Sequence, residues 1–241
     1  TTVSSILFKT LCMLVFIEIS VVFFLKNSFI TVIVTDFLNV SINLTTTILL
    51  WYAAKSFLPA SRKNATGWGI LCLAQALFTT ADLIWTVFEV FLKINPYPSI
   101  TDIFYLAYYP VFFIGILFLS RKSENKIIQF NNWLDAAIVF IVLGLYLGVY
   151  IFPGIIDNAA NEPAVIRFLS LAYPAGDLFL FIALLILIYN RDEKKFDMPV
   201  LFIILSAAIQ IVTDIIYSYQ TLEDVYVSGG WLDIGWILSY L

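Results

Sequence analysis

The sequence WGILCLAQALFTTADLIWTVFEVFL, residues Trp68–Leu92, sets Asp82 deep within a long run of mainly apolar residues. An α-helix needs about 20 mainly apolar residues to cross the hydrocarbon core of a bilayer, and this stretch is long enough. A charge near the bilayer centre costs at least about 2.5–3.5 kcal/mol, so we expect Asp82 to face the interior of a helix bundle. The stretch therefore predicts a membrane-spanning helix with a buried acid.

The rest of the chain follows the same pattern. It has 241 residues, of which 61% are hydrophobic and 12% are charged, whereas soluble domains are about 25% charged. Long apolar stretches predict helices at roughly Ile6–Leu25, Thr35–Ala54, Trp68–Leu92, Ser99–Leu119, Trp133–Phe152, Val165–Tyr189, Pro199–Tyr219 and Gly230–Leu241. The last stretch is too short to cross a bilayer, which favours a piece of a longer protein. We expect an all-α integral membrane protein, an eight-helix bundle whose eighth helix is truncated.

Basic residues gather in alternate connections between the predicted helices. One side holds Lys9, Lys55, Arg62, Lys63, Arg121, Lys122, Lys126, Arg191, Lys194 and Lys195, and the other side holds Lys26, Lys93 and Arg167. Cytoplasmic connections carry an excess of lysine and arginine. The bias therefore predicts that the N-terminus lies inside and that a completed eighth helix would end inside.

An internal repeat relates the two halves of the chain. The segments TTADLIW and IVTDIIY align Asp82 with Asp214, and Asp102 follows the first acid at nearly the distance at which Asp233 follows the second. We expect one transmembrane domain, residues 1–241, with repeat 1 at about 1–125 and repeat 2 at about 126–241. Because each unit contains four helices, an even number, the two repeats should be parallel and related by an axis along the membrane normal.

Acidic and aromatic residues concentrate in the outer half of the predicted bundle. Asp82, Asp177 and Asp214 lie well inside apolar stretches, and tryptophan and tyrosine residues are expected around them. The candidate ligand-binding residues are Asp82, Asp177, Asp214, Asp102, Asp233, Trp85, Tyr105, Tyr109, Tyr173 and Tyr217. Carboxylates beside aromatic rings suit a cation or a polar ligand with an apolar body. The alternative is that the acids form interhelical hydrogen bonds and the rings form an ordinary interfacial belt.

Helix-start patterns provide a structural explanation for some acids. PSITD, NWLD and GWLD each set an aspartate, namely Asp102, Asp135 and Asp233, in what would be a first helical turn. An acid there binds free backbone N–H groups and favours the positive end of the helix dipole. Asp135 would begin its helix from the inner face and the other two from the outer face. A pattern found on both faces is chiefly a helix-start device.

Composition argues against several classes of function. The chain has no histidine, which removes the commonest ligand for zinc, copper and haem and the usual proton shuttle at neutral pH. We expect no cofactor, no metal site and no enzymatic activity in this region, and no nucleic-acid partner, because no large basic patch exists. Cys12 and Cys72 are expected to be unpaired thiols. Gly144 and Gly148 form a GxxxG pattern that favours close helix contact, within the bundle or in a homodimer.

Four motifs together resemble a known class of receptor region. PYPSITDIFYLAYYP, NNWLDAAIVF, LAYPAGDLFLF and GGWLDIGWILSYL occur in this order. They resemble the multi-helix membrane sensory region at the N-terminus of bacterial and archaeal signalling proteins, which continue into PAS, histidine-kinase or diguanylate-cyclase domains. The matching positions are Pro98, Ser99, Asp102, Tyr105, Leu106, Tyr109, Pro110, Leu134, Asp135, Tyr173, Pro174 and Asp177. The resemblance spans about Gln75 to Leu241.

The resemblance implies a sensory module in a prokaryotic cell membrane. It would bind a small ligand, or respond to the state of the lipid bilayer, and pass the signal to a cytoplasmic effector domain in the same chain. Two alternatives remain open from the residues. Parallel repeats with acids inside the bundle also fit a transporter for a small cationic or amphipathic solute, and a structural anchor would use the acids only to hold helices together.

Overall fold

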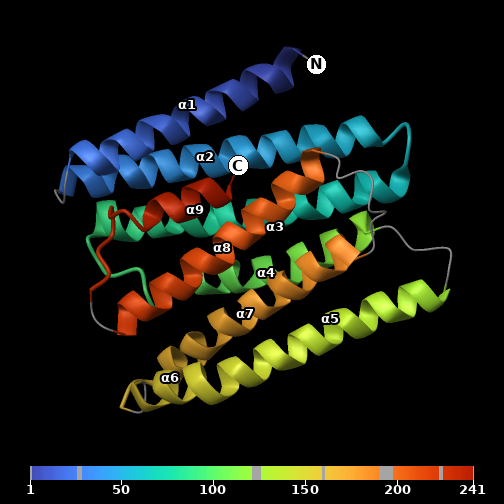
Figure 1. The fold of residues 1–241 in the computed structure, drawn as a ribbon. Coiled ribbons are helices and arrows are strands. Elements are labelled where there is room, and N and C mark those ends of the chain that lie inside the picture. The colour runs from blue at the N-terminus through green and yellow to red at the C-terminus, as the bar shows by residue number, and fades with distance from the viewer. Residues whose placement is uncertain are drawn as a thin grey trace.

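A computed structural model describes residues 2–25, 29–120, 126–158, 161–189, 198–222 and 225–240. These ranges are all-helical, without a β-strand among them (Figure 1). In chain order the elements are α1 (Thr2–Phe24), α2 (Phe29–Phe57), α3 (Arg62–Thr86), η1 (Val87–Leu92), α4 (Thr101–Leu119), α5 (Lys126–Tyr146), η2 (Leu147–Ile151), α6 (Phe152–Asn158), α7 (Ala164–Tyr189), α8 (Met198–Leu222) and α9 (Asp233–Ser239). The segments η1 and η2 are π-helical continuations of α3 and α5.

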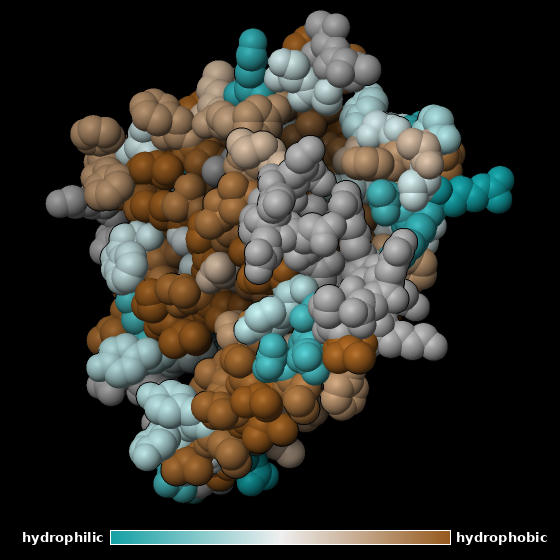
Figure 2. Space-filling view, turned by 45° about the vertical axis from the view of Figure 1, so that its right-hand side comes forward, coloured by the Kyte–Doolittle hydropathy of each residue, from teal (hydrophilic) through white to brown (hydrophobic). Residues whose placement is uncertain are grey.

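Within the described ranges, 7 helices are long and apolar enough to cross a bilayer. They coincide with the first seven apolar stretches, which identifies a multi-pass membrane protein. The eighth stretch contains α9, which has only 7 residues. Brown, apolar side chains cover much of the face in Figure 2, as expected for a surface in contact with lipid.

The helices pack in a ring that α9 completes. α1 packs on α2, α2 on α3, α3 on α4, α4 on α7, and α7 on α8, while α9 contacts both α8 and α1. α5 lies outside this ring against α7 (Figure 1). Only 6% of the α5 span is buried, against 50% of the α7 span, so α5 is peripheral and α7 is central.

Glycines allow the inner helices to approach closely. A Cβ on Gly115 of α4 would lie 2.7 Å from Leu71 of α3, and one on Gly176 of α7 would lie 2.6 Å from the ring of Tyr109. Real Cβ atoms do not come this close to another heavy atom, so larger residues would push these helices apart. The α3–α4–α7 core therefore depends on small residues at its contacts.

Two features differ from the expectations. Asp135 was predicted to cap a helix, but α5 begins at Lys126, so Asp135 lies in the helix interior and is exposed. The polar residues ahead of the apolar stretch continue the helix, and Asn132 Nδ2 donates a 2.6 Å hydrogen bond to the last carbonyl of α7, on Tyr189. The short helix α6 and the π-helical segments were not predicted. Cys12 and Cys72 are unpaired, as predicted.

Part of the predicted topology falls outside the described residues. Lys26, Arg121, Lys122, Arg191, Lys194 and Lys195 lie there, as do residue 125 at the expected repeat boundary and Leu241. In Figure 1, the α2–α3 connection lies at one end of the bundle, and the η1–α4, α6–α7 and α8–α9 connections lie at the other.

Candidate functional site

A cavity of about 580 Å³ lies within the helix ring, beside the η1–α4, α6–α7 and α8–α9 connections. Its volume falls in the range of small-molecule sites, roughly 300–1,000 Å³. Nine of the ten predicted ligand-binding residues line it, namely Asp82, Asp102, Asp214, Asp233, Trp85, Tyr105, Tyr109, Tyr173 and Tyr217. The tenth, Asp177, is buried on α7 and is not among the residues that line the cavity. The fold therefore brings the predicted set together.

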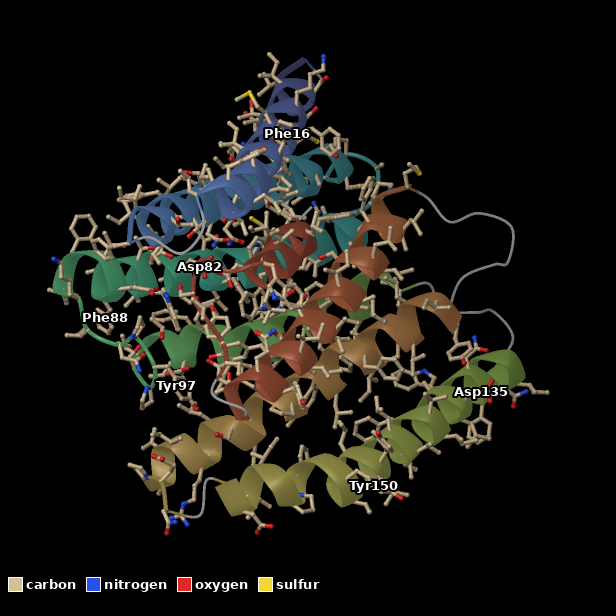
Figure 3. All side chains as sticks on the ribbon, turned by 60° about the vertical axis from the view of Figure 1, so that its left-hand side comes forward. Phe16, Asp82, Phe88, Tyr97, Asp135 and Tyr150 are labelled. Atoms are coloured by element: carbon tan, nitrogen blue, oxygen red, sulfur yellow. The ribbon has the colours of Figure 1, made fainter. Side chains whose placement is uncertain are left out.

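Asp82 joins three helices. Its Oδ2 accepts a 2.5 Å hydrogen bond from Asn43 Nδ2 on α2, and its Oδ1 accepts a 2.6 Å hydrogen bond from the Tyr105 hydroxyl on α4. Asn43 Oδ1 in turn accepts a hydrogen bond from Nε2 of Gln75 on α3, and both residues are buried. Figure 3 shows Asp82 inside the bundle, whereas Asp135 lies on the outer helix α5 and Tyr150 on its continuation η2. Both oxygens of Asp82 are thus engaged by the protein.

Asp214 joins α8 to α9. Its Oδ1 accepts a 2.7 Å hydrogen bond from Trp236 Nε1 on α9, and its Oδ2 accepts a 2.8 Å hydrogen bond from Gln210 Nε2. Gln210 Oε1 accepts a further hydrogen bond, 2.7 Å long, from Ser239 on α9. These contacts hold α9 against α8.

Asp102 and Asp233 each stand in the first turn of a helix. Asp102 Oδ2 accepts a 2.7 Å hydrogen bond from the backbone N–H of Ser99, and Asp233 Oδ2 accepts one of 2.7 Å from the N–H of Gly229. Each acid therefore binds a backbone N–H just ahead of its helix, as the helix-start interpretation predicted. Gly229 has φ +76°, a left-handed conformation that glycine adopts without steric cost, and this turn aims its N–H at the carboxylate.

Each first-turn acid also binds a phenol. Tyr173 of α7 donates a 2.5 Å hydrogen bond to Asp102 Oδ1, and Tyr226 donates one of 3.2 Å to Asp233 Oδ1. Tyr226 lies outside the membrane spans. Burial is the main cause that raises its pKa well above the ordinary value, and the nearby Asp233 carboxylate is the next. Burial also raises the pKa of Tyr97 in the η1–α4 connection. Both rings therefore present neutral hydroxyl groups at pH 7.

The α3–α4 and α8–α9 pairs share one hydrogen-bond pattern. Tyr105 stands three residues after the first-turn acid Asp102 and binds the deep acid Asp82. Trp236 stands three residues after the first-turn acid Asp233 and binds the deep acid Asp214. Within about one turn, the second helix of each pair thus carries both the acid at its start and the side chain that binds the deep acid of the first helix.

The cavity wall is acidic and aromatic. Six of its residues carry carboxyl groups and ten carry aromatic rings, and no lysine or arginine is among the described residues that line it. The carboxyl residues are Asp36, Asp82, Asp102, Glu162, Asp214 and Asp233. A second cavity, of about 650 Å³, shares Trp85, Tyr97 and Tyr217 with the first and adds Glu89 and Lys93. We call this second cavity the vestibule.

Several buried oxygens lack a hydrogen-bond partner among the described residues. Two of them, Asp36 Oδ2 and Asn39 Oδ1, belong to residues of α2 that line the cavity. The others are Asp177 Oδ1 and both carboxyl oxygens of Glu18. The Asn39 oxygen is an acceptor, and the carboxyl oxygens are acceptors when ionised, so hydrogen-bond donors would satisfy them.

No family model, curated protein or solved structure matches this chain. Within the described ranges, no three histidine, cysteine, aspartate or glutamate side chains converge into a group that could hold a metal ion. The arrangement instead suits a positively charged organic ligand, because aromatic rings and carboxyl groups surround the cavity and its described wall residues include no lysine or arginine.

Sequence reasoning did not single out two wall residues, Tyr226 and Trp236. Trp236 carried a usable signal, because it follows Asp233 by three residues as Tyr105 follows Asp102. Tyr226 lies in a connection without periodicity, and only the turn at Gly229 brings it to Asp233. Asp36 and Asn39 belong to a polar stripe of α2, but the sequence does not show that their oxygens lack partners.

Proposed function

We propose that this chain is the membrane-embedded sensory module of a prokaryotic signal-transduction protein and binds a small cationic or amphipathic ligand. The observation that carries the proposal is the cavity wall, with six carboxyl groups, ten aromatic rings and no lysine or arginine among its described residues. Such a wall attracts positive charge and offers apolar contact to the rest of the molecule. Here the described chain contributes binding and signalling rather than catalysis.

The attachment of α9 supports a sensory role. Asp233, Trp236 and Tyr240, which begin, continue and follow α9, all line the cavity. The Thr46 hydroxyl of α2 donates a 2.9 Å hydrogen bond to the carbonyl oxygen of Tyr240. A ligand that moved the cavity wall would therefore move α9 against α2. We infer that the signal leaves through α9 toward a cytoplasmic effector domain in the same chain.

The shared hydrogen-bond pattern supports two parallel four-helix repeats. In this arrangement α9 begins the eighth helix, the N-terminus lies inside, and the cavity faces the outer side of the cell membrane. The pairs Tyr105–Asp82 and Trp236–Asp214 then occupy equivalent places.

The motif residues that carry the resemblance to prokaryotic sensory regions also support the proposal. Asp102 of the Pro-Ser-x-x-Asp motif binds Tyr173 of the Tyr-Pro-x-x-Asp motif, and Tyr109 lies against Gly176 beside Asp177. Residues far apart in the chain thus meet at one cavity. A motif set that served only to start helices would not need to converge in this way.

Fluorine NMR on protein labelled with 5-fluorotryptophan tests the proposal in lipid nanodiscs. Small amphipathic cations and their neutral isosteres are added, and Trp236→Phe assigns the α9 resonance. We expect bound cations to shift the Trp236 signal and to leave that of Trp133, exposed on α5, unchanged. A compound that binds by calorimetry without any response of Trp236 would overturn the sensory proposal.

A transporter is the second candidate, and the acids Asp82, Asp177 and Asp214 inside the membrane-spanning helices favour it. Acids at such positions mark ion pathways and proton relays in membrane proteins, so they suit exchange of a proton for a cationic solute. This candidate predicts flux of small cations into proteoliposomes that Asp82→Asn or Asp214→Asn abolishes. Absence of flux for compounds that bind would exclude it.

Helix α5 supports a proposed homodimer. A Cβ on Gly144 or Gly148 would meet no atom within 4 Å, so the glycine pair faces away from the described bundle. Two copies approaching at these glycines would bring their α5 backbones into close contact.

A further inference from the structure

We propose that the ligand is a protonated primary or secondary amine, and that its N–H groups bind Asp36 and Asn39 on α2. This inference rests on the proposed function and narrows its ligand to one chemical class. The argument concerns which acceptors of the cavity wall are already engaged by the protein.

Four of the six cavity acids are engaged on both carboxyl oxygens. Asp82, Asp102, Asp214 and Asp233 each accept two hydrogen bonds from protein donors, one on each oxygen. Glu162 is exposed to solvent. Asp36 differs from all of these, because it is 7% exposed and its Oδ2 has no partner among the described residues.

Asn39 provides a second free acceptor beside Asp36. The two residues are three apart on α2, so they share one face of the helix, and both line the cavity. Asn39 Oδ1 is buried and has no partner in the described part of the chain. Because a buried acceptor without a hydrogen bond is costly, a bound molecule with two N–H donors would stabilise this pair.

The type of cation follows from the need for donors. A quaternary ammonium is attracted by carboxylates and rings but has no N–H group, so it leaves both oxygens unsatisfied. A primary or secondary ammonium has two or three donors and carries the same charge. A hydrogen bond that includes a charged partner is also stronger than a neutral one.

The surroundings of Asp36 favour a cation over a neutral donor. Glu89, Asp82 and Asp233 all lie within electrostatic range of its carboxyl group. Lys93 lines the vestibule and is not among the residues that line the cavity. The rings of Trp85 and Tyr105, whose centroids are 6.4 Å apart, flank the cavity nearby and suit the apolar body of the amine.

Three matched probes test the inference: 2-phenylethylamine, its N,N,N-trimethyl derivative and 2-phenylethanol. Binding to the full chain in lipid nanodiscs at pH 7 is measured by isothermal titration calorimetry. We expect the primary amine to bind about tenfold or more tightly than the trimethyl derivative, since charge-assisted hydrogen bonds are lost in the latter. The alcohol, which lacks the charge, should bind more weakly than the amine.

Two variants test the location. Asp36→Asn and Asn39→Leu should each weaken binding of the primary amine by about tenfold and leave binding of the trimethyl derivative less affected. Asp135→Asn, which changes an exposed acid of α5 outside the cavity, is the matched control and should retain selectivity. Melting curves of each variant confirm that it folds, which Asp36→Asn should do because its Oδ2 contacts no described protein donor.

Each contrary outcome has a distinct meaning. Equal affinity for the primary and trimethyl compounds overturns the amine inference and leaves a cation-binding sensory cavity in place. Selectivity that survives in both variants overturns the assignment to Asp36 and Asn39. Absence of binding by all three probes also overturns the amine inference, whereas the proposed function stands or falls separately on the Trp236 response to other compounds.

Discussion

At the scale of single residues, the carboxyl groups of the cavity are of two kinds. Both oxygens of Asp82 and of Asp214 accept hydrogen bonds from the protein, and these bonds include contacts to other helices, whereas Asp36 has a buried oxygen that contacts no described donor. The first kind builds the wall, and the second is the kind that we propose binds the ligand. Mutations at the two kinds should therefore have different consequences.

Asp82→Ala should destabilise the protein. It leaves Asn43 Nδ2 and the Tyr105 hydroxyl without their acceptor, and an unsatisfied buried polar group costs about 1–3 kcal/mol. Chemical denaturation in detergent micelles measures the free energy of unfolding. Asp36→Ala should cause a smaller loss, because no described donor depends on its Oδ2. Equal losses would contradict the division into two kinds.

The sequence predicted the acids of the cavity but not their partners. Asp82 and Asp214 were recognisable because a charge deep in an apolar stretch must face the bundle interior. Their donors come from other helices, as Tyr105 and Asn43 do, and a single sequence does not reveal which helices touch. For the same reason it gave no sign that Asp36 lacks a partner.

At the scale of elements, α4 and α7 pack closely where the aromatic ring of Tyr109 contacts Gly176. Gly176→Ala sets a Cβ 2.6 Å from the Tyr109 ring, and relieving that overlap should lower the free energy of unfolding by about 1–3 kcal/mol. Gly69→Ala on α3 is the control, since its Cβ meets no atom within 4 Å and alanine is the better helix former. Unfolding curves that show the same change for both variants would refute this view of the α4–α7 contact.

Helix α9 is too short to be stable by itself and depends on its neighbours. Thr46→Val removes the hydroxyl that donates to the Tyr240 carbonyl, a bond worth about 0.5–1.5 kcal/mol. Amide hydrogen exchange in α9 should therefore become faster. Thr45→Val is the control, because the Thr45 hydroxyl bonds only to the Ser41 carbonyl of its own helix. Unchanged exchange in Thr46→Val would show that this contact does not hold α9.

The membrane helices could be predicted from apolar length, but their ends could not. A helix that continues past the hydrocarbon core has no apolar signal there, which is why α5 begins at Lys126, ahead of the predicted start at Trp133. The same reason explains the incorrect cap at Asp135. Nothing in the local sequence marks the π-helical segment Val87–Leu92, where six residues complete α3.

At the scale of the whole molecule, the proposed orientation predicts which face reacts with external reagents. Ser228 lines both the cavity and the vestibule, whereas Ser61 precedes α3 at the opposite end of the bundle. In a background without Cys12 and Cys72, Ser228→Cys should react with a membrane-impermeant maleimide on intact cells. Ser61→Cys should react only after the membrane is permeabilised. The reverse pattern would invert the topology.

The proposed dimer predicts a loss of association when α5 is made bulkier. Gly144→Leu with Gly148→Leu should abolish crosslinking between copies in lipid nanodiscs, while amine binding to each copy remains. Val142 is exposed and lies two residues from Gly144, on a different face of the helix. Replacing Val142 by leucine therefore provides a comparison outside the glycine pair. Crosslinking that persists in the glycine variant would assign the contact to another helix.

The ring of helices also has a consequence for biosynthesis. α9 supplies Asp233, Trp236 and Tyr240 to the wall, and it is the last described element to leave the ribosome. Until it arrives, the groups on α2, α3 and α8 that it covers face an unfinished groove. The cavity is therefore complete only after α9 has packed against the helices that precede it. A nascent chain without α9 should not bind the proposed ligand, and a ligand present during synthesis should act only once α9 has packed.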